Sequence, residues 1–185
     1  FKVNGKIPNV IVYYAGCGEA TGGDDNTIWP HELDLPLSYG NMSGHIFSSY
    51  FVGNELYGTT EKYQPMGIGV LVHEFGHAMG LPDFYDPTYS YQGDSPFGYW
   101  SVMDGGAYVD YAYAPIGYNA YERSFMGWLD IKEVPESGLV TLANPNSAEG
   151  DMAVMFRNPK NTMEYFIFEN RQPGTWYPED FGSGV

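Results

Sequence analysis

The sequence predicts a mixed α/β fold, an α+β arrangement in which a buried helix lies against a twisted mixed sheet. Short apolar runs, most of them with β-branched or aromatic residues, are typical of strands and occur at residues 9–15, 45–52, 138–142, 152–156 and 164–169. A longer apolar run at residues 67–79 has the length and the stop signals of a buried helix. The stretch between these regions, residues 84–110, is rich in Gly, Pro, Tyr and Asp and predicts an irregular segment.

The helix predicted at residues 67–79 has identifiable ends. Gly80 suits the left-handed residue that stops a helix, and Pro82 prevents its continuation. Pro65 is predicted to lie in the first turn. The glycines at the start of this run weaken helix propensity, so we expect them to allow close approach of neighbouring backbone.

A second, amphipathic helix is predicted at residues 114–127, with Pro115 in its first turn and Gly127 at its end. Residues 16–26 form a glycine-rich loop with Asp24 and Asp25. This loop is expected to be a solvated connection, with structural Ca²⁺ as the alternative interpretation of its carboxylates.

Composition restricts the classes of partner. A chain of 185 residues with 43% hydrophobic residues can bury a substantial core, and no apolar run approaches the length of a membrane span. A net charge of −15 disfavours nucleic acid and anionic membranes as partners. The acidity favours solubility, with basic substrates as the alternative explanation. We expect a monomer that neither binds nucleic acid nor inserts into a membrane.

The single cysteine, Cys17, excludes an internal disulfide and does not indicate a compartment. It is expected to be a packed residue at the end of a strand. The first residues do not read as a signal peptide, so the chain is interpreted as a fragment or processed form with its targeting sequence elsewhere.

The predicted helix carries the chemistry of the chain. His73 and His77 are four residues apart, which places both imidazoles on one helix face, within reach of a single ion. Zinc accepts about four ligands, one of them water in catalytic sites. Glu74 follows the first histidine on a neighbouring face, where a carboxylate can take a proton from that water. The pattern predicts a zinc hydrolase site.

A second motif supports this prediction. Trp100-Ser-Val-Met-Asp-Gly-Gly106 resembles the methionine-containing turn that lies beneath the metal in metzincins. Together with residues 73–86, it resembles the immune-inhibitor-A-type secreted bacterial metallopeptidases. Weaker similarity extends over residues 14–19, 28–31, 126–129 and 168–172. The resemblance implies that Met103 supports the site from below without binding metal.

Comparison with known zinc sites narrows the choice of residues that could be the third metal ligand. A thermolysin-like site needs a glutamate on a second helix, but no glutamate lies between Ala78 and Tyr121, and no histidine follows His77. In metzincins a glycine turns the chain and a ligand comes six residues after the second histidine. Gly80 and Asp83 occupy those positions, and carboxylate is an acceptable zinc ligand. Asp83 is therefore the predicted ligand and Asp86 the nearby alternative.

The resemblance implies a zinc-dependent endopeptidase that is secreted or displayed at the cell surface. The rival interpretations are a zinc amidohydrolase acting on a non-peptide amide and an inactive relative that only binds polypeptide. The expected boundaries are a catalytic domain at residues 1–129, divided into an upper half (1–80) and a lower half (81–129), and a β-rich extension at residues 130–185.

Two details of the expected cleft stay open. Many metzincins have a tyrosine two residues after the turn methionine, where this chain has Gly105. Tyr108 is the predicted oxyanion donor, with Tyr111 and His31 as lesser candidates. An edge strand pairs with extended substrate in metzincins, and the sequence does not decide whether residues 45–52 form that strand.

Overall fold

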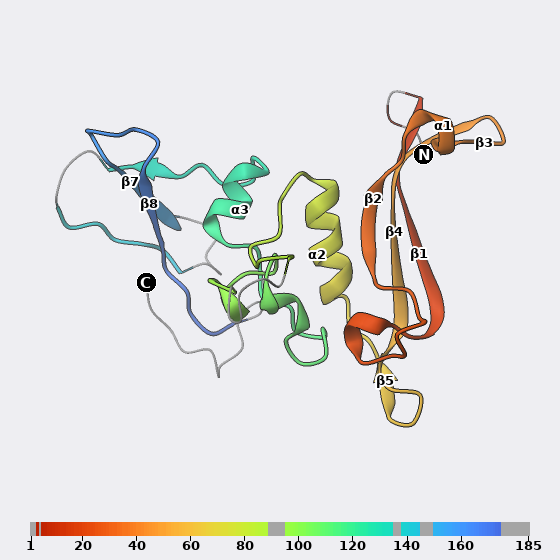
Figure 1. Ribbon diagram of the computed structural model, residues 1–185. Coiled ribbons are helices and arrows are strands. Elements are labelled where there is room, and N and C mark those ends of the chain that lie inside the picture. Colours follow the sequence, from red (N-terminus) through yellow and green to blue (C-terminus); the bar gives the residue numbers. More distant parts are fainter. Residues whose placement is uncertain (1–2, 4, 89–94, 135–137, 145–149, 175–185) are drawn as a thin grey trace. The chain divides into compact units, whose positions relative to one another are not determined.

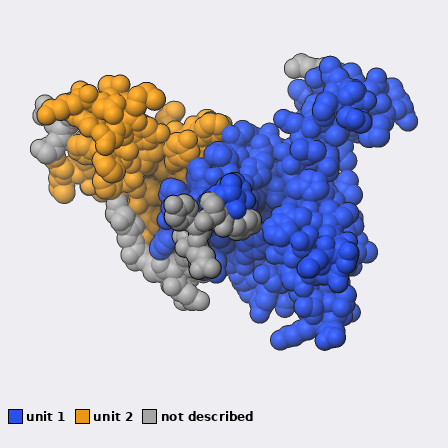
Figure 2. Space-filling model, in the orientation of Figure 1, with its two compact units in different colours: residues 1–115 blue, residues 116–185 orange. Residues whose placement is uncertain are grey.

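The computed structural model describes residues 3, 5–88, 95–134, 138–144 and 150–174. The chain divides into two compact units, Phe1–Pro115 and Ile116–Val185, which Figure 2 shows in different colours. The first unit contains the histidine motif and the methionine turn. No described helix has the length and apolarity needed to span a membrane.

The first unit is built on a mixed sheet centred on β4 (His45–Gly58). β1 (Lys6–Cys17) pairs with β4 in parallel and β2 (His31–Asp34) pairs with it antiparallel, in the order β1-β4-β2 (Figure 1). Two short strands, β3 (Asn41–Met42) and β5 (Tyr63–Pro65), also pair with β4. Residues 45–52 are therefore part of a central strand, and β2 forms the edge beside α2.

The helix α2 (Gly69–Ala78) packs on this sheet. Phe51 of β4, Val70 of α2 and Ala112 form a buried apolar cluster. The start of the helix approaches the chain after the methionine turn very closely. A Cβ at Gly67 or Gly69 would collide with the main-chain oxygen of Ala112 or Ala107 respectively, which confirms the expected close approach.

The segments around the sheet and α2 are short. The structure has a one-turn helix α1 (Leu37–Gly40) and three 3-10 turns, η1 (Glu19–Thr21), η2 (Gly98–Trp100) and η3 (Gly105–Tyr108). The described part of residues 84–110 contains no strand or α-helix, as its composition predicted. The Asp24 carboxylate accepts hydrogen bonds from the main-chain and side-chain amides of Asn26, which closes the loop locally.

The second unit contains the three-stranded sheet β6-β7-β8. Its strands are β6 (Lys132–Glu133), β7 (Ala153–Arg157) and β8 (Tyr165–Glu169). The helix α3 (Ala120–Phe125) begins at a capping box in which Asn119 and Glu122 bond each other's main-chain amides. It packs on β8, where the Glu169 carboxylate accepts the Ala120 N–H at 2.7 Å and an Arg123 N–H at 3.3 Å.

Three expectations about secondary structure were wrong. Pro65 ends β5 instead of starting the helix, which begins at Gly69. The second helix spans only six residues because Asn119 caps it, although Gly127 follows its end with a left-handed φ of 73° as expected. Residues 138–142 form no strand, and the short β6 pairs with β7 in their place.

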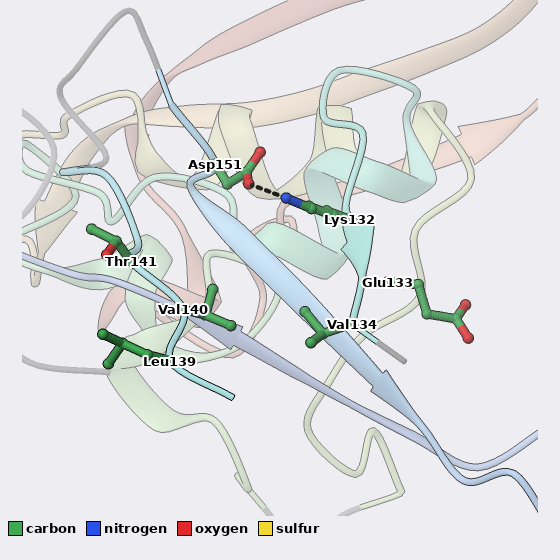
Figure 3. Close-up of a pocket in the computed structure, with 7 residues that line it drawn as sticks. All are labelled: Lys132, Glu133, Val134, Leu139, Val140, Thr141 and Asp151. Atoms are coloured by element: carbon green, nitrogen blue, oxygen red, sulfur yellow. Dashed lines mark hydrogen bonds and ion pairs between the residues drawn. The ribbon is translucent and has the colours of Figure 1, made fainter. Parts of the chain in front are cut away.

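Leu139, Val140 and Thr141 instead line a surface hollow of about 300 Å³ in the second unit (Figure 3). Its rim carries an ion pair between Lys132 Nζ and Asp151 Oδ2, 3.3 Å apart. Both side chains are largely exposed, so the pair contributes little to stability.

Candidate metal centre

The end of α2 determines where the candidate ligands lie. Gly80 has a left-handed φ of 96°. Its N–H bonds the His77 carbonyl at 2.8 Å, and the Leu81 N–H bonds the Gly76 carbonyl at 3.0 Å. This pair of bonds is the Schellman arrangement. Because the chain reverses here, residues 81–83 return alongside the last turn of the helix.

Main-chain carbonyls orient both histidine rings. His73 Nδ1 lies 2.8 Å from the Val102 carbonyl oxygen, and His77 Nδ1 lies 2.8 Å from the Leu81 carbonyl oxygen. A carbonyl can only accept, so each Nδ1 carries its proton. In a neutral imidazole, Nε2 is then the lone-pair atom that binds metal.

Both Nε2 atoms face the same carboxylate oxygen. Asp83 Oδ1 lies 3.1 Å from His73 Nε2 and 3.2 Å from His77 Nε2. It is fully buried and has no hydrogen-bond partner of acceptable geometry. Among the residues that the structure describes, His73, His77 and Asp83 form the one cluster with metal-ligand spacing, all three ligand atoms lying within 4.8 Å of one another.

The charges of this cluster are strongly coupled. Burial opposes ionisation of His77, but Asp83 and the Leu81 carbonyl outweigh it and raise the pKa of His77 to about 9. The pKa of Asp83 is lowered despite burial, because both histidine rings lie against its carboxylate and favour its charged form. If one histidine ring is protonated, its Nε2–H can donate to the Asp83 carboxylate, but the Nε2 lone pair of the other ring still faces that carboxylate without a donor between them. A cation between the two rings and the carboxylate satisfies all three groups, so the residues fit a metal ion.

Asp86, the alternative ligand, is engaged elsewhere. Its Oδ1 accepts hydrogen bonds from the Thr88 N–H at 2.8 Å and the Thr88 hydroxyl at 2.7 Å. It does not belong to the cluster of His73, His77 and Asp83. The donor set offered by that cluster is two imidazole nitrogens and one carboxylate oxygen, which suits zinc better than calcium or magnesium.

Glu74 is buried beside this cluster, with 8% of its surface exposed. Burial raises the pKa of its carboxyl group, while His73, His77 and the main-chain N–H of Glu32 oppose that rise. The Glu32 N–H, from strand β2, donates to Glu74 Oε2 at 2.9 Å. Glu74 is therefore a desolvated carboxylate in which a hydrogen bond holds one oxygen, Oε2.

The methionine turn connects the two parts of the cluster. The Val102 carbonyl orients His73, and the neighbouring Met103 carbonyl accepts the N–H of Phe84, the residue after Asp83. Met103 itself is fully buried. The turn is stabilised by Asp104, whose carboxylate accepts the main-chain N–H groups of Phe97, Gly98 and Gly105. These bonds explain why the turn can hold a ligand orientation.

The structure places the aromatic candidates at different sites. Tyr108 packs, partly buried, against the cluster of Phe51, Val70 and Ala112. Tyr111 has a left-handed φ of 55° and its ring meets Tyr57 edge-on.

Both ring nitrogens of His31 are already engaged. Its Nδ1 lies 2.8 Å from the Trp29 carbonyl oxygen and its Nε2 lies 2.9 Å from the Tyr50 hydroxyl. A further aromatic residue, Tyr85, stacks on the His73 ring with a centroid separation of 6.2 Å.

The comparison with protein families is decisive. Residues 2–128, well over half of the chain, match the model of the immune inhibitor A peptidase M6 catalytic domain. The chain belongs to the immune inhibitor A peptidase family. It therefore carries a metallopeptidase catalytic domain, and its mixed sheet with the helix α2 is the metzincin-like α+β fold expected from the motifs.

Individual members of the family are moderately similar. The chain is 28% identical over 144 residues to immune inhibitor A of Bacillus thuringiensis subsp. alesti, covering 71% of this chain and 21% of that protein. It is 29% identical over 136 residues to pre-pro-metalloprotease PrtV of Vibrio cholerae serotype O1, covering 66% of this chain and 14% of that protein. The chain thus spans about a fifth or less of the length of these relatives.

Sequence reasoning missed several groups at the site because they belong to the main chain. The carbonyls of Leu81 and Val102 and the N–H of Glu32 have no residue-type signature. For Leu81 a signal existed, since a helix stopped by Gly80 brings the next carbonyl back to the last turn. Tyr85 was one of many tyrosines in its segment, and nothing in the sequence distinguished it.

Proposed function

We propose that this chain is a zinc-dependent endopeptidase with His73, His77 and Asp83 as the metal ligands and Glu74 as the general base. One observation carries the proposal most strongly. Two imidazole lone pairs and a buried, unpartnered carboxylate oxygen converge within 4.8 Å, next to a buried glutamate. Family membership supports peptide bonds as the substrate, and proteins are the substrate class.

When bound, zinc supplies a Lewis acid that acidifies water and polarises a carbonyl. The protein supplies everything else. The Val102 and Leu81 carbonyls keep the two Nε2 lone pairs directed at the ion, and Gly80 keeps Asp83 opposite them. Met103 supports the site through the turn that contains Val102.

Glu74 moves the proton. Its carboxylate accepts a proton from the attacking water and then delivers it to the nitrogen of the departing amine. Burial raises the pKa of Glu74, which makes the carboxylate a stronger base than one in water. The pKa shift therefore has the direction that general-base catalysis requires.

The free edge of β2 is the proposed binding strand for substrate. β2 bonds β4 on one side and lies beside α2. An extended peptide added to that edge gains main-chain hydrogen bonds independent of its sequence. The scissile bond would then lie close to Glu74, which contacts the same strand.

The proposed donor to the developing oxyanion is Tyr108. Tyr85 is its structural rival, because its ring stacks on His73 while that of Tyr108 packs against the apolar cluster. Outside the site, the proposal includes secretion and a monomeric state, as the family resemblance and the acidic charge suggest.

The test is hydrolysis of casein by the purified protein, with released peptides identified by mass spectrometry. Activity is expected to disappear after treatment with a zinc chelator and to return with one equivalent of Zn²⁺. New peptide termini inside casein chains are expected for an endopeptidase. Zinc-loaded protein that cleaves peptidoglycan or glycoprotein amides but no peptide bond would contradict the proposal.

A further inference from the structure

The edge strand β2 presents alternate main-chain groups to opposite sides. The Leu35 N–H, one residue past the strand, donates to the Ser48 carbonyl of β4 at 2.7 Å. Antiparallel strands alternate, so His31 and Leu33 also point their N–H groups towards β4. Glu32 and Asp34 therefore point their N–H groups away from β4, towards the free edge.

The outward N–H of Glu32 has a partner that does not belong to the sheet. It donates to Oε2 of Glu74, 42 residues later, at 2.9 Å. Within the described part of the chain, no other hydrogen bond to the Glu74 carboxylate is found. The general base of the proposed reaction is thus held by one main-chain amide of the edge strand.

We propose that Glu32 is a positioning residue whose main-chain N–H holds Oε2 of Glu74 and so leaves Oε1 as the proton-accepting atom. The inference rests on the proposed function, since it assigns a role within that reaction. It also connects the base to the strand on which substrate would bind, because the same residue, Glu32, belongs to both.

The physical need for this bond follows from the burial of Glu74. A desolvated carboxylate is disfavoured in its charged form, and a hydrogen bond from an N–H favours that form. The terminal torsion of a glutamate is also broad, so an unheld carboxylate can present either oxygen. One donor on Oε2 removes that freedom at a small cost, since the amide is already fixed by the strand.

The bond also restricts how a peptide can pair with β2. The N–H of Glu32 is occupied by Glu74, so it is unavailable to a substrate. Among the residues that the structure describes, the Glu32 carbonyl and the N–H and carbonyl of Asp34 are outward groups for which no hydrogen bond is found, so they are the groups offered to a substrate. A substrate that pairs through these groups would lie beside Asp34. The hydrogen bond between the Glu32 N–H and Glu74 would be kept while the substrate is bound.

Hydrogen exchange measured by NMR on the zinc-loaded protein tests the bond without reference to activity. The Glu32 amide is expected to exchange at least about tenfold more slowly than the outward-facing Asp34 amide. The variant Glu74→Ala should bring the Glu32 rate to that of Asp34, while the Leu35 amide, bonded to β4, stays protected and reports an intact strand. Equal rates for Glu32 and Asp34 in the wild-type protein would overturn the proposal.

Proline substitution tests the consequence for catalysis. Among the main-chain groups, Glu32→Pro removes only an outward N–H, and proline is tolerated at such positions of edge strands. We expect kcat to fall about 100-fold, the effect of a misplaced catalytic group, with KM changed less than about twofold and zinc content retained. The loss of the Glu32 carboxylate is controlled by Glu32→Ala. Glu32→Ala keeps the amide, so its kcat should exceed that of Glu32→Pro by at least about tenfold.

Asp34→Pro is the matched control. It removes the other outward N–H of the same strand, so it should raise KM while kcat stays closer to that of the wild type. A Glu32→Pro variant with a raised KM and an unchanged kcat would contradict the proposed role. A wild-type protein that exchanges as expected but cleaves no peptide would instead contradict the proposed function.

Discussion

Two buried glutamates distinguish the two compact units of this molecule. Glu74 on α2 has 8% of its surface exposed, and Glu122 on α3 is fully buried. Glu122 completes a capping box. Its carboxylate accepts the main-chain N–H of Asn119, and the Asn119 side chain accepts the main-chain N–H of Glu122. From the described residues Glu74 receives a single N–H, on Oε2, and it lies among the charges of His73, His77 and Asp83.

The difference separates the structural carboxylate of Glu122 from that of Glu74, the proposed general base. Burying a carboxylate is costly, and the chain offsets that cost at Glu122 by fixing a helix end with it. At Glu74 the cost is offset only in part, since only its Oε2 accepts a hydrogen bond from the described residues, and the proposed reaction uses the other oxygen. Partial satisfaction of a buried acid beside a cluster of candidate metal ligands is therefore the feature that distinguishes Glu74 from Glu122.

The substitution Glu74→Gln should sharpen this comparison most. Loss of the base is expected to lower kcat about 10²- to 10⁴-fold, with zinc content unchanged by elemental analysis. The matched variant is Glu122→Gln, which should lower the free energy of unfolding by about 1–3 kcal/mol and leave kcat within about twofold. A larger loss of turnover in Glu122→Gln than in Glu74→Gln would break the comparison.

The substitution Tyr108→Phe should lower kcat about 10²- to 10³-fold, the usual cost of removing one oxyanion donor, without loss of zinc. Steady-state kinetics on a fluorogenic peptide measure it. Tyr85→Phe is the matched variant because it likewise removes one phenolic hydroxyl group, here from the ring that stacks on His73. A full effect in Tyr85→Phe, with none in Tyr108→Phe, would transfer the oxyanion role to Tyr85.

The substitution Asp83→Asn should weaken zinc binding by more than about 100-fold, the upper end of what loss of an outer hydrogen-bond partner costs. The reason is that a neutral amide replaces the charged oxygen that both histidines face. Competition with a chromophoric chelator measures the affinity. Asp86→Asn should leave it unchanged, and equal losses in both variants would refute the ligand assignment.

The smallest effect is expected for Gly80→Ala. A left-handed φ of 96° disfavours any residue with a Cβ, so the free energy of unfolding should fall by about 1–2 kcal/mol. Urea denaturation measures the change. Gly67→Ala provides the contrast, because a Cβ there collides with the Ala112 main chain instead of straining its own torsion. A Gly80→Ala protein as stable as the wild type would contradict the role of the helix stop.

The sequence predicted those parts of the fold and site whose causes are local. The helix α2 and its stop at Gly80 followed from spacing and from one glycine, and the family assignment followed from the two motifs. The strands β7 and β8 were also predicted within one residue at each end. Each of these features depends on neighbours within a few residues.

Features that depend on distant contacts were not predicted. The edge strand β2 has four residues with no alternating pattern, and it exists because β4 provides its partner. The helix predicted at residues 114–127 is shorter in the structure. The capping box of Asn119 and Glu122 sets its start at Ala120, so the residues before Asn119 lie outside the helix. Residues 138–142 had strand composition but no strand to pair with.

The reversal of the chain at Gly80 has a consequence for assembly of the site. The three atoms that converge belong to residues 73–83, so bringing them together requires closure of a loop of only ten residues. The carbonyl that orients His73 comes from Val102, 29 residues away. Loop-closure entropy grows with the logarithm of length, so the longer closure costs about 1 kcal/mol more. The helix and its reversal therefore bring the three candidate ligand atoms together at a lower entropic cost than the one at which the methionine turn reaches the His73 ring.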